Sequence, residues 1–156
     1  MKTIGMYTLI KPDDSFTGKM PSPRVYLGGQ SRGRDWRLDF FQRFSRMDVT
    51  FINPRREPFI DPELEPAAHA KQVAWERKAL DVSDIGVFWL GEGLSNQAAR
   101  VEIGYMLGAQ KPVLLGAQTG FMGVEHLVGF SGLVVAPTLD GLMNRFASVL
   151  TGLQTS

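Results

Sequence analysis

One glutamate lies where an apolar helix face is expected. Glu102 belongs to the segment 95–110, SNQAARVEIGYMLGAQ, which has few polar residues and reads as a helix. Because a helix turns about 100° per residue, Glu102 lies on the side opposite the stripe that contains Gln97 and Arg100. A carboxylate on an apolar face is costly unless it is paired or has a function. The alternative is a glutamate near the helix start that reaches solvent, where the helix dipole favours it.

A second carboxylate and a group of arginines could act with Glu102. Glu76 lies beside Trp75 in the segment 67–84, which is also expected to be helical, although charged helix residues usually face water. Arginines that suit a phosphate or carboxylate follow the first two expected strands, namely Arg32, Arg34, Arg55 and Arg56. The glycine loop GGQSRG between them matches neither a dinucleotide-binding nor a Walker A spacing, so a simple tight turn explains it equally well.

The composition limits the possible functions. The chain has 156 residues, a net charge of +1, 44% hydrophobic residues and no cysteine, which excludes disulfides and thiolate chemistry. His69 and His126 are far apart and lack metal-site spacing. The small net charge does not indicate binding to a nucleic acid polymer. No apolar run is long enough to span a membrane. We expect one cytoplasmic domain over residues 1–156, with no metal, other cofactor or membrane partner.

Strands and helices alternate along the chain. The sequence predicts strands over 24–29, 48–54, 85–90, 112–117 and 133–137. It predicts helices over 35–47, 67–84, 95–110 and 138–150. This alternation predicts an α/β flavodoxin-like (Rossmann-like) three-layer sandwich, with a five-stranded parallel sheet in the order 2-1-3-4-5 and helices on both faces. Residues 1–23 are expected to form an N-terminal extension, with an edge strand within 1–10 and a mobile loop over 11–23.

Local signals place several side chains within these elements. The second helix should bury Val73, Trp75 and Leu80. The third should be capped by Ser95 or Asn96. In a sheet of this order, ligands bind beyond the carboxyl ends of the strands, near the point where the strand order reverses. Because Glu102 lies close to the start of the helix after the third strand, it can face this crevice.

Four stretches, taken in order, resemble the nucleoside 2-deoxyribosyltransferase-like family. They are VYLGGQSRGRDWR, VTFINPRRE, QVAWERKALDVSDIGVFWL and ARVEIGYMLGAQKPVLLG. That family includes transferases that move deoxyribose between bases and hydrolases that cut the N-glycosidic bond of deoxynucleoside monophosphates. The resemblance therefore implies cleavage of the N-glycosidic bond of a (deoxy)nucleoside or nucleoside 5′-monophosphate through a covalent glycosyl-glutamate, with the sugar passed to another base or to water.

The resemblance assigns roles to individual residues. Glu102, in VEIGY, matches the family nucleophile, and Glu76 matches an acidic residue that contacts the base in relatives. Asn96, six positions before the nucleophile, matches a polar residue of the family. The remaining expected substrate contacts are Tyr26, Gly28, Gly29, Arg32, Arg55 and Trp89. The segment 98–100, AAR, replaces glycines that relatives often have before the nucleophile, which is expected to change how the sugar sits.

Two other functions fit parts of the same pattern. TIR-type NAD glycohydrolases share the flavodoxin-like layout and a catalytic glutamate on a helix, although the NPRR and WE elements argue against this class. The second alternative function is that of a non-catalytic nucleotide sensor that has kept the pocket. The family resemblance also implies a homo-oligomer, because relatives often complete the site with a neighbouring subunit. Phe121 and Phe130 are expected to be exposed and could serve such an interface, or could pack on their own sheet.

Overall fold

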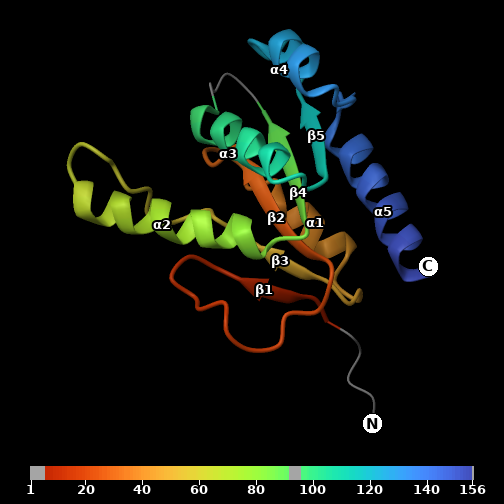
Figure 1. Cartoon of the computed structure of the whole chain (residues 1–156), viewed down its shortest axis with the longest axis horizontal. Helices are drawn as coiled ribbons and strands as arrows, with labels where there is room; N and C mark the ends of the chain where they lie inside the picture. Colours follow the sequence, from red (N-terminus) through yellow and green to blue (C-terminus); the bar gives the residue numbers. More distant parts are fainter. Residues whose placement is uncertain (1–5, 92–95, 156) are drawn as a thin grey trace.

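The computed structural model describes residues 6–91 and 96–155, which form a parallel sheet covered by helices on both faces (Figure 1). The strands are β1 (Thr8–Ile10), β2 (Arg24–Gly29), β3 (Thr50–Ile52), β4 (Ile85–Leu90), β5 (Val113–Ala117) and β6 (Val135–Ala136). The helices are α1 (Arg37–Arg43), α2 (Pro66–Val82), α3 (Gln97–Gly108), α4 (Val124–Ser131) and α5 (Leu139–Thr155). The α/β class predicted from the sequence is confirmed.

The strand order is β1-β3-β2-β4-β5-β6, and every pairing is parallel. Strands β2 to β6 correspond to the five predicted strands and have the predicted order. The sheet has six strands rather than five, because β1 adds to the edge beside β3, with Thr8 opposite Thr50. The segment between β1 and β2 is a loop, as predicted, but it is held against α2, since Trp75 Nε1 donates to Asp14 O at 2.9 Å and the rings of Trp75 and Phe16 are in contact.

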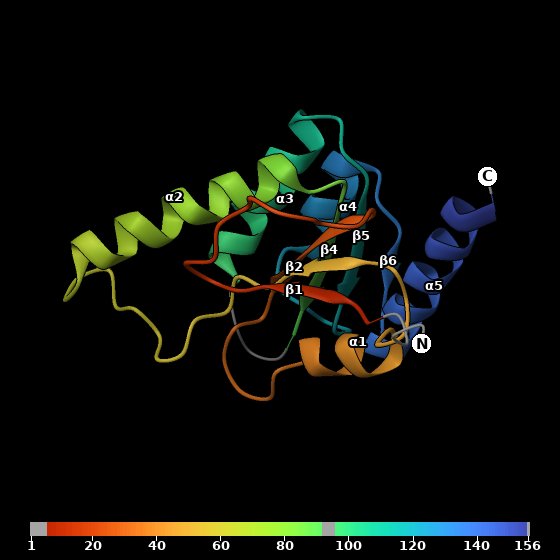
Figure 2. The ribbon, with the colours of Figure 1, turned by 90° about the horizontal axis from the view of Figure 1, so that it is seen from below.

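Alternate side chains along each strand enter different cores, because successive residues of a strand point to opposite faces. Helices α2 and α3 cover one face of the sheet, and α1 and α5 cover the other (Figure 2). In β2, Tyr26 enters the core beneath α2 and α3, whereas Val25 and Leu27 enter the core beneath α1 and α5. The site-bearing face is therefore the one that α2 and α3 cover.

The structure corrects several element boundaries. Helix α4 was not predicted; it is short, and it lies between Gly123 and Gly132, whose φ angles of 79° and 73° only glycine adopts easily. Helix α1 ends at Arg43, earlier than predicted, and α5 continues past the predicted end. Asn96 occupies the N-cap position of α3 in a left-handed conformation, and Ser95, the other predicted cap, lies outside the described residues.

Some burial predictions are also corrected. Trp75 and Leu80 are buried as predicted, but Val73 is 46% exposed because it lies on the solvent side of α2. Phe130 is exposed as predicted, whereas Phe121 is buried and packs in the core under α3. Within the described ranges, no helix has the length and apolar character needed to cross a membrane.

Candidate active site

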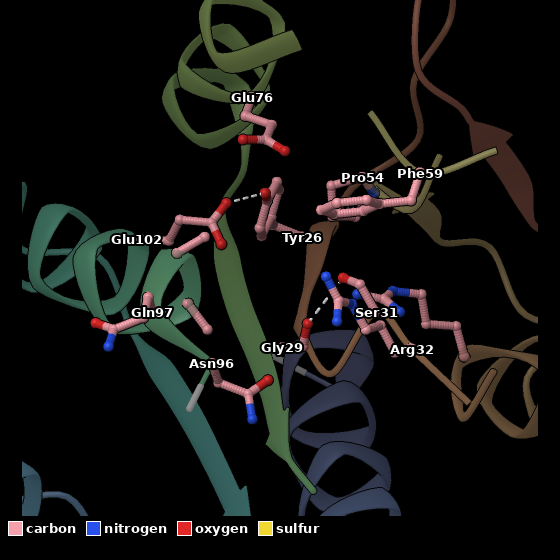
Figure 3. Close-up of a pocket in the computed structure, with 13 residues that line it drawn as sticks. Tyr26, Gly29, Ser31, Arg32, Pro54, Phe59, Glu76, Asn96, Gln97 and Glu102 are labelled. Atoms are coloured by element: carbon pink, nitrogen blue, oxygen red, sulfur yellow. Dashed lines mark hydrogen bonds between the residues drawn. The ribbon is translucent and has the colours of Figure 1, made fainter. Parts of the chain in front are cut away.

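A cavity of about 360 Å³ opens beyond the carboxyl ends of β2, β3 and β4. Its walls come from five parts of the fold: β2 with the loop after it, the start of α1, the loop after β3, helix α2, and the first turns of α3. The volume falls within the range of about 300–1,000 Å³ that is usual for sites of small organic ligands. In the view of Figure 3, Tyr26 and Glu102 lie between Glu76 and Asn96, which are at opposite ends of the cavity.

Glu102 is held by a hydrogen bond from Tyr26. The Tyr26 hydroxyl donates to Glu102 Oε2, which joins the centre of β2 to the first turns of α3 (Figure 3). Tyr26 is fully buried, and its ring lies against that of Phe88 from the neighbouring strand. A rigid aromatic donor of this kind fixes the direction of the carboxylate, because the tyrosine cannot turn away without disturbing the core.

The surroundings of Glu102 disfavour its charged form. Burial raises the pKa of Glu102 to about 8, and the nearby charge of Glu76 adds to the rise. The hydrogen bond from Tyr26 and the positive charge of Arg37 act in the opposite direction. Burial, together with the charges of Glu102 and Glu76, also raises the pKa of Tyr26 well above its usual value, so its hydroxyl remains a donor.

Glu76 faces the same cavity from α2, and Gln72 one turn earlier holds it. Gln72 Nε2 donates to Glu76 Oε2 at 3.1 Å and to Pro54 O at 3.1 Å. Gln72 Oε1 accepts a hydrogen bond from Arg56 Nε at 3.0 Å. Burial raises the pKa of Glu76, while the hydrogen bond from Gln72 and the charges of His69 and Arg56 oppose the rise. The two carboxyl groups thus share one partly desolvated site.

Arg37 also lines the cavity, although the sequence reasoning did not select it. It lies at the start of α1 and is completely buried. Its Nε donates to Leu27 O at 2.9 Å, and its Nη1 donates to Gln30 O at 2.9 Å and lies 3.4 Å from Asp35 Oδ1. Burial lowers the pKa of Arg37, but a guanidinium of this kind remains charged.

The outer wall is formed by two loops that meet above the sheet. Ser31 and Arg32 come from the loop after β2, and Pro54 and Phe59 come from the loop after β3. The Arg32 guanidinium lies 4.8 Å from the centre of the Phe59 ring, which is the geometry of a cation–π contact. Figure 3 shows the Phe59 and Pro54 rings on the side of the cavity opposite Glu102.

A family model described as "nucleoside 2-deoxyribosyltransferase like" matches residues 22–121. The chain belongs to this family. The match covers β2 through β5 and therefore includes every residue described above as lining the cavity. No curated protein matches the chain. Membership in the nucleoside 2-deoxyribosyltransferase-like family supports glycosyl transfer to or from nucleosides at the level of the family.

Six of the residues predicted from the sequence lie together at the cavity of this nucleoside 2-deoxyribosyltransferase-like protein. They are Tyr26, Gly29, Arg32, Glu76, Asn96 and Glu102. They come from β2, the loop after it, α2 and the start of α3, which are far apart in the sequence. Gly29 has a φ of 118°, and a Cβ there would lie 2.0 Å from Trp89 O, so this close approach to β4 requires glycine.

Three predicted substrate contacts are not among the residues that line the cavity. Gly28 has a packing role, since a Cβ there would lie 2.3 Å from the Phe88 ring. Arg55 is held by Asp35 at 3.5 Å and by Glu57 at 2.8 Å. Trp89 packs with the core beneath α1 and α5, on the other face of the sheet from Glu102, because alternate residues of β4 point in opposite directions. The cavity does not support the predicted contact of Trp89 with substrate.

The side chains of the AAR segment, residues 98–100, lie in two places: the alanines at the cavity wall and the arginine outside the cavity. The methyl groups of Ala98 and Ala99 lie at the cavity wall. Arg100 turns toward α4, where its Nη2 donates to Met122 O at 2.5 Å and its guanidinium lies over the Phe121 ring. The replacement of glycine therefore adds two small apolar groups to the wall and places no charge in the cavity.

Proposed function

We propose that this protein cleaves the N-glycosidic bond of a nucleoside or nucleoside 5′-monophosphate, with Glu102 as the nucleophile. The proposal is supported most directly by the Tyr26–Glu102 hydrogen bond inside a cavity that Glu76 also lines. A carboxylate with a fixed direction and a second carboxyl group nearby are what retaining glycoside cleavage requires.

In the proposed reaction, Glu102 attacks the anomeric carbon C1′ of the sugar. A bond forms between a carboxylate oxygen and C1′ as the bond from C1′ to the base nitrogen breaks, and the bonding electrons leave with the base. The base then gains a proton and departs. The sugar remains as an ester of Glu102 until water or a second base attacks C1′ and restores the carboxylate.

The protonation states of the two carboxyl groups fit this sequence. With a pKa of about 8, Glu102 is largely protonated in the free protein at neutral pH and must lose that proton before it attacks. The departing base must gain a proton, and the raised pKa of Glu76 makes it a suitable donor. In the proposed reaction, the two carboxyl groups share one proton, which lies on Glu76 when the substrate is bound. Glu102 is then ionised for attack, and Glu76 can protonate the departing base.

The test is the release of free base from a panel of nucleosides and nucleoside 5′-monophosphates, separated by chromatography. The wild type should release base from at least one of them, and Glu102→Ala should lower kcat by about a thousandfold or more, because the covalent route is lost. Glu125→Gln, which alters an exposed glutamate on α4, is the matched control and should retain full activity. An undiminished rate in Glu102→Ala would refute the proposed role.

The same panel separates the alternatives. Release of nicotinamide from NAD, without release of base from nucleosides, would indicate a glycohydrolase of the TIR type. Stabilisation of the protein by a nucleotide without any turnover, unchanged in Glu102→Gln, would indicate a nucleotide sensor.

A further inference from the structure

One buried arginine, Arg37, and one partly buried arginine, Arg55, share a single carboxylate near the cavity. Asp35 Oδ1 lies 3.4 Å from Arg37 Nη1 and 3.5 Å from Arg55 Nη1. The other acidic partner of Arg55 is Glu57, whose side chain is largely exposed and therefore screened by water. In the described part of the chain, a buried and a partly buried guanidinium thus lie around one partly buried carboxylate.

The same two arginines have nitrogens with no hydrogen-bond acceptor among the residues that the structure describes. They are Arg37 Nη2, Arg55 Nε and Arg55 Nη1. A buried donor left without an acceptor costs about 1–3 kcal/mol, and more for a charged group, so such groups are rare and call for an explanation. For Arg37 the explanation can be a ligand, because Arg37 lines the cavity and Arg55 does not.

The position of Arg37 gives the cavity two chemically different ends. Its guanidinium is fixed at the carboxyl end of β2 by the carbonyls of Leu27 and Gln30, close to the loop that carries Ser31. Glu76 is on α2, and Figure 3 shows it on the far side of Tyr26 from Ser31. The cavity therefore has a carboxyl end at Glu76 and a cationic end at Arg37, with Glu102 between Glu76 and Asn96.

We propose that Arg37 is a specificity-determining residue that binds the phosphoryl group of a nucleoside 5′-monophosphate. This inference rests on the proposed function and narrows its substrate class. If the base lies toward Glu76 and C1′ lies at Glu102, the 5′ end of the sugar extends toward the loop after β2. A phosphoryl oxygen there accepts a hydrogen bond from Arg37 Nη2 and offsets the positive charge of the guanidinium. A nucleoside, which ends in a neutral hydroxyl, brings no negative charge to Arg37.

Binding of the isolated sugar phosphate is the direct test, because it requires no turnover. The probes are 2-deoxyribose 5-phosphate and 2-deoxyribose, titrated into the full-length protein by calorimetry. A charge-assisted hydrogen bond is worth about 1.5–3 kcal/mol, so the phosphate should bind the wild type about 10- to 100-fold more tightly than the neutral sugar. Equal affinity for the two probes would overturn the inference.

Two variants assign the effect to Arg37. Arg37→Gln should remove the preference for the phosphate, while Arg46→Gln, at an exposed arginine after α1, should keep it. Because Arg37 is buried and its loss endangers folding, Asp35→Asn provides a second variant that keeps the oxygen which Arg37 contacts. Removing the shared negative charge should tighten binding of the phosphate about 3-fold or more. Unchanged or weaker binding in Asp35→Asn, or a preference retained in folded Arg37→Gln, would contradict the assignment.

Failure of this inference is distinguishable from failure of the proposed function. If nucleosides release base at least as fast as their 5′-monophosphates, measured as kcat/KM, the role of Arg37 is wrong and the glycosidase activity stands. If no base is released but the sugar phosphate binds in an Arg37-dependent manner, the anion site stands and the proposed catalysis is wrong.

Discussion

At the scale of single residues, the cavity keeps two carboxyl groups in surroundings that oppose negative charge. Glu102 and Glu76 each have a raised pKa, chiefly through burial, and the charge of Glu76 adds to the rise at Glu102. Tyr26 and Arg37 partly compensate at Glu102. Shifts of this kind are typical of sites that carry out proton transfer or nucleophilic attack, and they carry a cost in stability that can be measured.

The first prediction concerns that cost. Between pH 4.5 and about 8 the folded protein holds a proton on Glu102 that the unfolded chain has released, so the free energy of unfolding should fall as the pH rises through this window. Glu102→Gln cannot ionise and should avoid this loss. At pH 9 the variant should be more stable than the wild type by on the order of 2 kcal/mol, allowing for partial solvent access.

Urea denaturation of both proteins at pH 5 and pH 9 provides the measurement. At pH 5 the two stabilities should lie much closer together, because Glu102 then keeps its proton in the wild type. A difference that does not grow with pH would mean that the Glu102 carboxyl is not held in its neutral form.

The second prediction concerns Tyr26. Tyr26→Phe removes the hydrogen bond that stabilises the Glu102 carboxylate, so the pKa of Glu102 should rise further. The rise of kcat/KM with pH, which reports ionisation of the nucleophile, should then move to higher pH. We also expect kcat to fall by about 10- to 100-fold, because the carboxylate loses its fixed direction. A pH–rate profile with an unmoved limb would show that Tyr26 does not act on the ionisation of Glu102.

At the scale of elements, a series of polar contacts between side chains runs from two loops to the face of α2 that packs on the sheet. Asp13 pairs with Arg56 at 2.8 Å, Arg56 donates to Gln72, and Gln72 donates to Glu76. The loop after β1 is thereby linked through the loop after β3 to a carboxyl group of the cavity. Gln72 is itself buried, and its hydrogen bonds with Arg56 and Pro54 join it to the loop after β3.

The third prediction follows from this series of contacts. Gln72→Leu removes a hydrogen bond that favours the Glu76 carboxylate, so the pKa of Glu76 should rise, as measured by NMR of a ¹³C-labelled carboxyl. Base binding should weaken, with KM raised about 10-fold. Gln42→Leu, at an exposed position of α1, is the control. If the Glu76 titration is the same in Gln72→Leu and the wild type, Gln72 is only a packing residue.

The helix and strand periods account for what the sequence could predict of these elements. The apolar runs and the βα alternation predict the strand order. Glu102 could be selected as a candidate because it is an acidic residue on an apolar helix face. The same pattern was present for Arg37, which shares a helix face with the buried Phe40, Phe41 and Phe44, and it could have been found by the same test. Helix α4 escaped prediction because it is short and only partly buried, and its glycine boundaries were its main signal.

At the scale of the whole molecule, the arrangement of the cavity was less predictable than the fold. Sequence spacing along β4 could not by itself say that Trp89 belongs to the other face, because every residue of that strand is apolar or glycine. The sequence also could not show that Arg55 forms ion pairs with Asp35 and Glu57. Such pairings depend on loops that approach each other only in three dimensions.

The fourth prediction concerns assembly, which the family resemblance implied. Helices α3 and α4 border a groove, and apolar side chains beside it are strongly exposed, with Met122 84% and Phe130 87% accessible. Apolar exposure concentrated in this way is typical of an interface. We expect a homo-oligomer by light scattering coupled to size exclusion, dissociated by Phe130→Asp and unaffected by Leu38→Asp on α1. A wild-type monomer at concentrations of tens of micromolar would contradict this.

The covalent glycosyl-Glu102 intermediate is the central claim, and mass spectrometry of rapidly quenched reactions tests it most directly. During turnover of an active nucleotide or nucleoside, the wild type should gain the mass of the sugar, located on the peptide that contains Glu102. Glu102→Gln should show no such gain. Turnover by the wild type with no modified Glu102 peptide at any quench time, or with the sugar on a different residue, would contradict the account.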